Sequence, residues 1–317
     1  MNFSDALQLA REHTAIVQRM EHALRADPLN KRLSLGLGSA RRRAERSQLV
    51  LESMAETSQV DLIRYRLVRE SDLYAVEAVA DSVHAFQRSF TGAADYVVSG
   101  PKGKARYSRD IEEKTRLNIA YTFPGSLGIV LAVENNRSNL FRDGEYDAVV
   151  DVFDQFLTIQ NDNEAIDASR RMGSALISQL CRWVDVNSRW QNSIEFVLKL
   201  GNGIQRGGFI SKDRFYELSS IFGGAVDEEP SEFYDDGILV GLDLEVGNFH
   251  FVVPNGESYK GALSPNFIKE KTVVGAKYRA HISENLKRVV ATGVESRSFT
   301  LNSLLAPDTR NGDKTSS

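Results

Sequence analysis

The chain has 317 residues, enough for two domains that each bury a hydrophobic core. A hydrophobic fraction of 42% and a charged fraction of 26% are those of an ordinary folded protein, which excludes global disorder. The formal net charge of -4 excludes a bulk attraction to nucleic acid or to an anionic membrane, so either contact would need a local basic patch.

The cysteine content and the N-terminus bound the cellular context. The single cysteine, Cys181, excludes an intramolecular disulfide and a CxxC zinc site. The first residues include Asp5 and no continuous apolar run, so they do not have the pattern of a secretory signal. No stretch approaches the roughly 20 apolar residues that span a bilayer. We therefore expect a cytoplasmic protein without membrane contact, and we predict no cofactor.

Residues 1–58 predict a helical hairpin. An amphipathic helix is expected over residues 4–25, with Ser4 as its N-cap, and a second over residues 39–54, with Ser39 as its N-cap. Each helix has only a narrow apolar face, which buries little by itself. We expect the hairpin to pack on the rest of the chain or, through residues 4–56, on a second copy.

Residues 59–226 predict an α+β domain. The apolar patterns indicate, in chain order, a strand, a helix, a basic loop, two strands joined across Pro124-Gly125-Ser126, two helices, a strand and a short helix. Their ranges are 62–68, 72–90, 99–116, 117–123, 127–133, 146–159, 164–186, 194–200 and 212–222. The order favours a central mixed sheet with helices on one face.

The last part of the chain predicts a second domain. Residues 227–236 are rich in Asp and Glu around Pro230 and predict an extended acidic linker. Residues 237–306 consist of short apolar runs between glycine turns, which is typical of a small β-barrel of SH3 or OB-like size. The polar residues 307–317 predict a disordered tail.

Two basic segments are candidate binding sites. The first is on the second helix of the hairpin, where arginines offer planar donor forks for phosphate: Arg41, Arg42, Arg43 and Arg46. The second is the loop with Lys102, Lys104 and Arg106, where neighbouring glycines favour mobility and electrostatic capture of a polyanion or an acidic partner. The alternatives are a solvated helix face and an ordinary charged surface loop.

The β module offers aromatic and basic candidates. Phe249 and Phe251 flank His250 and are candidates for stacking on bases, and Lys277 and Arg279 belong to an excess of basic residues in the far half of the module. If the strands at 249–253 and 277–282 pair, His250 and His281 approach each other. The acidic linker could then fold back over the basic surface and be displaced by a partner.

The chemistry-bearing patterns elsewhere are weaker. Asp143, Asp147, Asp151 and Asp154 share one helix face and could hold Mg²⁺, although acidic residues are also favoured at a helix start. The glycine cluster at 201–208 follows a strand as phosphate-binding loops do, but it lacks the P-loop ending. Cys181 lies in an apolar helical pattern and is expected to be a buried, inert thiol.

These patterns leave three functional hypotheses. The leading one is a non-enzymatic binding or assembly protein that uses the hairpin and the β module, with a protein as its partner. The alternative is association with nucleic acid through Arg41–Arg46, the 102–116 loop and the basic half of the barrel. The third is a metal-dependent hydrolase or transferase built from the aspartate row and the glycine cluster.

Overall fold

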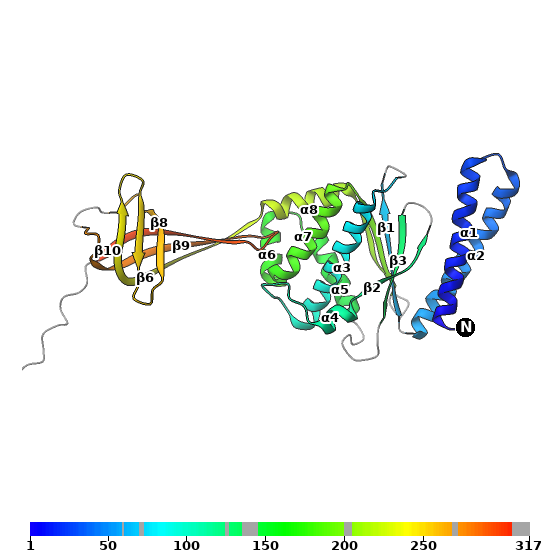
Figure 1. The fold of residues 1–317 in the computed structure, drawn as a ribbon, viewed down its shortest axis with the longest axis horizontal. Coiled ribbons are helices and arrows are strands. Elements are labelled where there is room, and N and C mark those ends of the chain that lie inside the picture. Colours follow the sequence, from blue (N-terminus) through cyan, green and yellow to red (C-terminus); the bar gives the residue numbers. More distant parts are fainter. Residues whose placement is uncertain are drawn as a thin grey trace, which may run out of the picture. The chain divides into compact units, whose positions relative to one another are not determined.

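The computed structural model describes residues 1–58, 60–69, 73–123, 127–134, 145–199, 205–267 and 272–305. The chain divides into two compact units: unit 1 comprises Met1–Ala225 with Val290–Gly293, and unit 2 comprises Val226–Val289 with the residues from Val294 onward (Figure 1). The α+β class predicted from the sequence is confirmed, with helices at the N-terminus and predominantly antiparallel sheets. The predicted disordered tail lies outside the described residues.

Unit 1 begins with the predicted helical hairpin, made of α1 (Phe3–Ala26) and α2 (Lys31–Ser58). Asn2, rather than Ser4, caps α1, because its side chain accepts from Asp5 N while the Asp5 carboxylate accepts from Asn2 N. The Asn30 side chain accepts from Leu33 N at the start of α2. The second helix therefore begins well before Ser39, where the sequence predicted its start.

Gly36 lies inside α2, although glycine is more common at turns and helix ends. A β-carbon at this position would lie 2.8 Å from Met20 Cε of α1. A larger residue at position 36 would therefore require the end of the Met20 side chain to shift.

The central sheet of unit 1 has the order β2-β3-β1-β4-β5. Its strands are β1 (Val60–Val68), β2 (Leu117–Phe123), β3 (Leu127–Glu134), β4 (Ser193–Lys199) and β5 (Gln205–Ile210). All four pairings are antiparallel, which corrects the predicted mixed sheet and confirms the predicted pairing of β2 with β3. The turn at 124–126 lies outside the described residues.

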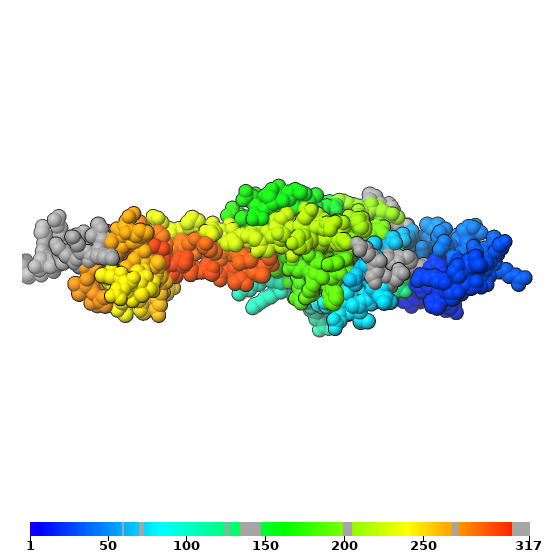
Figure 2. Space-filling model, turned by 90° about the horizontal axis from the view of Figure 1, so that it is seen from above, coloured from blue at the N-terminus to red at the C-terminus, as the bar shows by residue number. Residues whose placement is uncertain are grey.

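A layer of helices covers one face of this sheet. It comprises α3 (Val76–Ser99), α4 (Arg109–Lys114), α5 (Glu145–Leu157), α6 (Asp162–Met172), α7 (Ser174–Arg189) and α8 (Lys212–Gly224). Ile63, Tyr65 and Leu67 of β1 point into the core that these helices share with the sheet. Phe86, Phe153 and other aromatic side chains fill this core, and Figure 2 shows part of the outer surface of the layer in green.

The hairpin covers the opposite face of the sheet, which corrects the prediction of helices on one face only. Leu62 of β1 alternates with the core residues and packs in a second cluster with Ala6 of α1 and Leu51 of α2. Arg11 Nε also donates to the carbonyl oxygen of Ala120 on β2. The hairpin is thus packed on its own chain, one of the two arrangements that its narrow apolar face predicted (Figure 1).

The region predicted as one helix over residues 164–186 is two helices, α6 and α7. The break falls at Gly173, whose φ is +83°. A β-carbon there would lie 2.6 Å from both the backbone nitrogen and the oxygen of Lys102. Both the left-handed conformation and the close approach require glycine, so the chain turns where the apolar pattern continues.

A polar network lies in the core of unit 1. Trp183 Nε1 donates to the Tyr65 hydroxyl over 3.0 Å, Tyr65 lies 2.8 Å from Ser82 Oγ, and Ser82 donates to Asn187 Oδ1 over 2.7 Å. Burial raises the pKa of Tyr65 to about 12. Each hydroxyl has two hydrogen-bond partners within the network. The network therefore holds α3 and α7 on β1 as part of the core.

Unit 2 is a five-stranded sheet of β6 (Val226–Asp243), β7 (Asn248–Val252), β8 (Ser258–Leu263), β9 (Lys277–Val289) and β10 (Glu295–Leu305). Its order, β10-β8-β7-β6-β9, closes on itself because β9 pairs with both β6 and β10. Its core includes Leu239, Phe251 and Ile282. β8 was not predicted, because SYKGAL has little apolar content.

The predicted acidic linker at 227–236 is wrong, since these residues form the first part of β6 and pair with β9. The register places Asp227 opposite Arg288, Glu228 opposite Lys287 and Asp236 opposite Arg279. The repulsion that was expected to extend a free linker is offset by cations on the neighbouring strand.

The turn between β9 and β10 belongs to unit 1. Val290 is fully buried in the core of that unit, and its backbone nitrogen donates to Ala225 O over 3.1 Å. Gly293 has φ +66°, and a β-carbon there would lie 3.3 Å from Ser174 Cβ. The unit boundary at Ala225 and Val226 lies beside the predicted one, but unit 1 also includes the hairpin and this later segment.

Across the described parts of the chain, no helix has the length and apolar character needed to cross a bilayer.

Candidate functional site: a groove between the hairpin and the sheet

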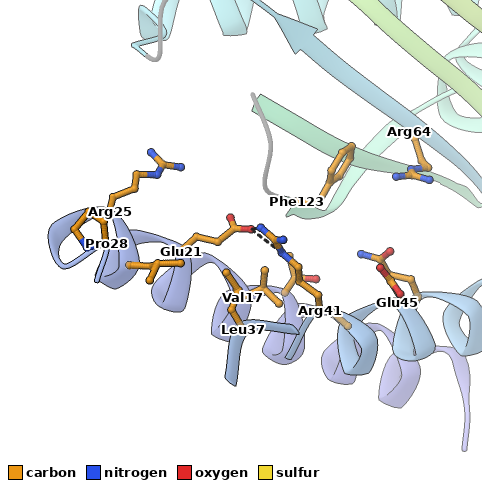
Figure 3. Close-up of a pocket in the computed structure, with 13 residues that line it drawn as sticks. Val17, Glu21, Arg25, Pro28, Leu37, Arg41, Glu45, Arg64 and Phe123 are labelled. Carbon is orange, nitrogen blue, oxygen red and sulfur yellow. Dashed lines mark hydrogen bonds and ion pairs between the residues drawn. The ribbon is translucent and has the colours of Figure 1, made fainter. Parts of the chain in front are cut away.

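A cavity of about 1050 Å³ lies within unit 1, between the helical hairpin and the central sheet (Figure 3). We call it the hairpin groove. Residues of α1, α2, β1 and β2 line it, from Thr14 to Arg25 on the first helix and from Leu37 to Gln48 on the second, together with Pro28 between the two helices. The base of the hairpin packs on the sheet, and the groove lies beyond that contact. A cavity of this size is in the range of ligand and peptide sites.

The floor of the groove is aliphatic. Val17 of α1 and Leu37 and Ala44 of α2 form a small buried cluster with Leu24 packed against it. The hydroxyl oxygen of Thr14 belongs to the same lining, is buried, and has no hydrogen-bond partner among the described residues. A buried hydroxyl without a partner costs about 1–3 kcal/mol, so this oxygen favours a ligand that brings a polar group to the floor.

The rim of the groove is charged. Arg41 Nη2 lies 2.8 Å from Glu21 Oε1, so one arginine of the lining is neutralised by a neighbouring carboxylate. Arg25 and Arg64 also line the groove, and no carboxylate pairs with either among the described residues. Figure 3 shows Arg64 across the groove from the Glu21–Arg41 pair. Glu45 of α2 lines the groove as well, so the lining has three arginines and two glutamates, and Arg25 and Arg64 are the arginines available to an anionic partner.

On the sheet side, the groove is lined by an aromatic ring and by a guanidinium group that lies over the ring. The ring of Phe123 lies against Gly128, where a β-carbon would lie 2.3 Å from Phe123 Cε2. The guanidinium carbon of Arg64 lies 5.1 Å from the centre of the same ring, a cation–π arrangement. The absence of a side chain at Gly128 thus leaves room for the ring, and the ring holds Arg64 at the groove.

Of the predicted arginines on α2, only Arg41 lines the groove. Arg42, Arg43 and Arg46 are exposed on the rest of the helix surface. The hairpin from Arg19 to Arg46 has eight basic and three acidic residues, a formal excess of five positive charges. The predicted basic patch is therefore a property of the whole distal hairpin.

The basic loop after α3 is held in place, which corrects its predicted mobility. Lys102 Nζ donates to both carboxylate oxygens of the buried Asp95 over 2.8 Å, and Lys102 O accepts from Ala175 N. Ser174 Oγ donates to Gly103 O. Part of the loop is the helix α4. Lys104 and Arg106 remain exposed, whereas Lys102 is occupied by an internal ion pair.

The aromatic candidates of the β module are in its core. Phe249 and Phe251 are buried inside unit 2, so stacking on a base by these rings is excluded in this fold. His250 is on the outward side of β7, opposite Lys260. It does not approach His281, because β6 lies between β7 and β9. Successive side chains of a strand point to opposite faces of the sheet, so both phenylalanines point into the core and the histidine between them points outward.

The basic candidates of the module are on β9. Lys277 and Arg279 are exposed, and the guanidinium carbon of Arg279 lies 5.7 Å from the ring centre of Tyr234. That ring stacks on His281 with centroids 4.5 Å apart. His281 and Ser283 both bond to Glu232, at 3.1 and 3.3 Å. The serine hydroxyl is therefore hydrogen-bonded to the carboxylate and not to the imidazole. In a serine nucleophile activated by a histidine base, the hydroxyl would be hydrogen-bonded to the imidazole.

The aspartate row of α5 is bound by a cation of the protein itself. Arg206 of β5 lies 2.6 Å from Asp151, 3.1 Å from Asp154 and 3.8 Å from Asp147. The hydrogen bond to Asp151 raises the pKa of Arg206. Asp143 lies outside the described residues. No group of three or more metal-ligating side chains is found in the described ranges.

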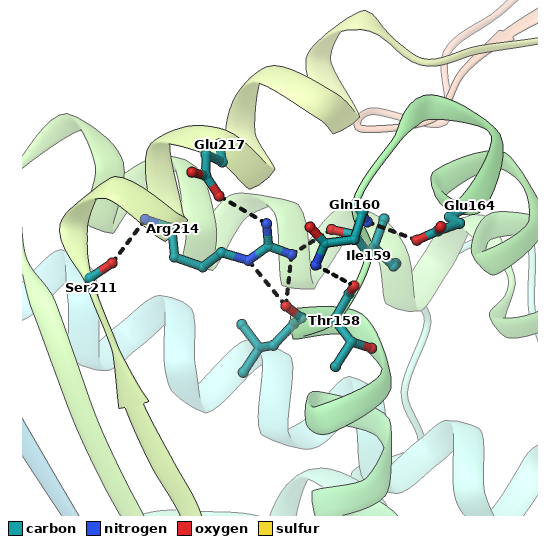
Figure 4. Close-up of polar contacts among 8 residues, drawn as sticks. Thr158, Ile159, Gln160, Glu164, Ser211, Arg214 and Glu217 are labelled. Atoms are coloured by element: carbon teal, nitrogen blue, oxygen red, sulfur yellow. Dashed lines mark hydrogen bonds and ion pairs between the residues drawn. The ribbon is translucent and has the colours of Figure 1, made fainter.

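The glycine cluster is also structural where it is described. Residues 205–208 belong to the edge strand β5, and residues 201–204 lie outside the described ranges. In the following helix, Arg214 donates to the carbonyl oxygen of Leu157, the last residue of α5, and to that of Ile159 beyond it, and it pairs with Glu217 over 3.0 Å (Figure 4). This arginine caps α5, as cations near helix C-termini do.

Cys181 is buried, as expected. Burial, with a smaller contribution from the charge of Asp185, raises the pKa of its thiol well above the ordinary value. A thiol with a raised pKa is a poor nucleophile, which agrees with the structural role predicted for it.

Sequence reasoning missed Thr14, Arg25, Arg64 and Phe123 as site residues. They come from three different elements, and only the packing of the hairpin on the sheet brings them together. The chain was compared with protein-family models, curated proteins and solved structures, and no significant match was found in any of the three.

Proposed function

We propose that this chain is a non-enzymatic binding or assembly protein, and that the hairpin groove is its principal binding surface. The observation that carries the proposal is the composition of the groove: an aliphatic floor with an unpartnered buried hydroxyl, and a rim with the unpaired Arg25 and Arg64. Sites that bind peptides and small molecules combine an apolar surface with a few placed polar groups. A protein partner in the cytoplasm is the context that we propose.

The β module is proposed as a second contact surface. Its closed strand order and its size resemble small barrels such as the SH3 and OB types, which commonly serve as binding modules. Its candidates on the outer face are the partly exposed His250 and the exposed Lys277 and Arg279. Because Phe249 and Phe251 are in the core, any binding by this module uses its charged outer face.

Association with nucleic acid is the alternative, and one observation favours it: the formal excess of five positive charges on the distal hairpin. It predicts binding of single- or double-stranded DNA or RNA that weakens steeply as salt rises. A filter-binding titration at several salt concentrations measures this, and no binding at low salt removes the alternative. The third hypothesis, metal-dependent hydrolysis or transfer, loses support because Arg206 occupies the aspartates that it requires.

The proposed function is tested by a photo-crosslinking amino acid placed at Gln48, a partly exposed residue of the groove lining. The matched control places it at Tyr216, which is 71% exposed on α8. In cells of the native host, we expect discrete adducts from position 48 that are absent from position 216 and that weaken when Arg25→Glu is added. The same adducts from both positions, or none from position 48, would contradict a binding function of the groove.

A further inference from the structure

We propose that the occupant of the hairpin groove is an amphipathic α-helix of a protein partner, with an acidic edge beside its apolar face. The inference rests on the proposed function and adds the chemistry of the partner. It follows from the length of the groove, the character of its floor and the charge on its rim.

The length of the groove fits a helix. The lining residues of α1 extend from Thr14 to Arg25 and recur mostly every three or four positions, as do those of α2, and Pro28 continues the lining beyond the end of α1. At a rise of about 1.5 Å per residue, this stretch of α1 is about 17 Å long, or roughly three helical turns. A groove that follows two helices over this distance accepts the apolar face of a third helix, a common mode of peptide recognition.

The charge on the rim of the groove favours acidic side chains along one edge of the bound helix. The positive excess on the distal hairpin attracts an acidic segment during encounter, and Arg25 and Arg64 have no carboxylate partner among the described residues. Glutamates along the edge of the bound helix would supply those partners. The Thr14 hydroxyl would accept or donate one hydrogen bond at the floor.

The same features disfavour the other occupants. A nucleic acid would pair its phosphates with the arginines but would leave the accessible apolar lining of Leu24, Pro28 and Phe123 without an apolar partner. A second copy of the hairpin would bring an equal positive excess to the same face, and like charges would repel. The positive charge of the hairpin therefore points to a different, acidic chain.

The test is a fluorescence anisotropy titration of the full chain with labelled probes. The main probe is a helix of about 14 residues, matched to the length of the groove, with leucine on one face and glutamate elsewhere. Three further probes replace glutamate by lysine, rearrange the same leucines and glutamates into an alternating pattern, or are single-stranded DNA of equal charge. We expect the glutamate helix to bind at least about tenfold more tightly than each of the others.

Two matched variants locate the binding. Arg25→Glu changes the charge within the groove lining, whereas Arg43→Glu makes the same change at an exposed position of the hairpin outside it. We expect a loss of affinity of about tenfold for the first and less than about threefold for the second. Thermal unfolding curves that match the parent chain show that both variants are folded.

The results separate this inference from the proposed function. Equal affinity for DNA or for the alternating probe, or equal losses in the two variants, would overturn the acidic helix while groove-specific adducts at position 48 still stood. Absence of those adducts would instead remove the binding function of the groove.

Discussion

Arg206 Nη2 on the edge strand β5 lies 2.6 Å from Asp151 Oδ1 on helix α5, and the same guanidinium group reaches Asp147 and Asp154. Three carboxylates at helical spacing thus converge on one cation from a different element. The negative charge of the carboxylates whose spacing suggested a metal site is therefore neutralised by the protein itself.

Replacing Arg206 with alanine removes the cation and leaves the three carboxylates to repel one another. Because Asp151 and Asp154 are about half exposed, we expect a modest loss of stability, about 1 kcal/mol, measured by urea unfolding. We also expect Mg²⁺ to raise the melting temperature of this variant and not that of the parent chain. A Mg²⁺-dependent shift in the parent chain would show that the carboxylates bind metal despite the arginine.

Gly173→Ala tests the break between α6 and α7. The added β-carbon would meet the backbone of Lys102, and the positive φ would be strained, so we expect a loss of about 1–3 kcal/mol in the free energy of unfolding. Gly223→Ala is the control, because that glycine lies in α8 with open space around its β-carbon position. There we expect no loss. Equal effects of the two substitutions would refute the role of close approach at Gly173.

Tyr65→Phe tests the buried polar network. Removing the hydroxyl leaves Trp183 Nε1 without its acceptor and Ser82 without one partner, for an expected loss of about 1–3 kcal/mol in urea unfolding. Tyr216→Phe, at an exposed position, should be neutral. A loss no larger than that of the control would show that the network contributes little.

The pH dependence of Tyr65 follows from its raised pKa of about 12. Its folded-state pKa lies above the unfolded value of about 10, so the unfolded state loses this proton first. The contribution of the buried phenol to stability is complete below about pH 10 and is lost as the pH rises toward about 12. Urea unfolding over this range should therefore show a shallower decline for Tyr65→Phe than for the parent chain, and parallel declines would contradict the assignment.

Glu228 and Glu232 test whether the acidic strand β6 masks cations of β9. Glu228 lies 2.7 Å from Lys287, and Glu232 bonds to His281. We expect the double substitution Glu228→Gln with Glu232→Gln to raise the salt concentration at which the chain elutes from immobilised heparin. Glu77→Gln with Asp213→Asn, at exposed positions of α3 and α8, changes the net charge equally. If both double variants elute later to the same extent, net charge alone accounts for the result.

Local patterns predicted those elements whose own residues carry a clear apolar periodicity. The alternation in β1, β2 and β3 and the three- and four-residue spacing in α1 and α8 gave nearly the observed bounds. Errors arose where distant residues decide the structure. Gly173 breaks a helix where the chain meets the backbone of Lys102, and the acidic residues of β6 form a strand because β9 brings cations to them.

The candidate site was less predictable than the fold. Arg41 was identified from its own segment, but Arg64 and Phe123 lie on strands whose alternation only predicts that some residues face outward. Which of those residues meet the hairpin depends on how it packs, and that contact has no local signature. The groove is therefore a property of tertiary structure.

The burial of Val290 beside Ala225 has a consequence for the order in which this chain can fold during synthesis. The ribosome releases residues 1–225 long before residue 290, so the first unit leaves the exit tunnel without one of the side chains that fill its interior. A truncated chain that ends at the unit boundary would have the same gap. Completion of the N-terminal unit must therefore wait until most of the C-terminal one has been translated.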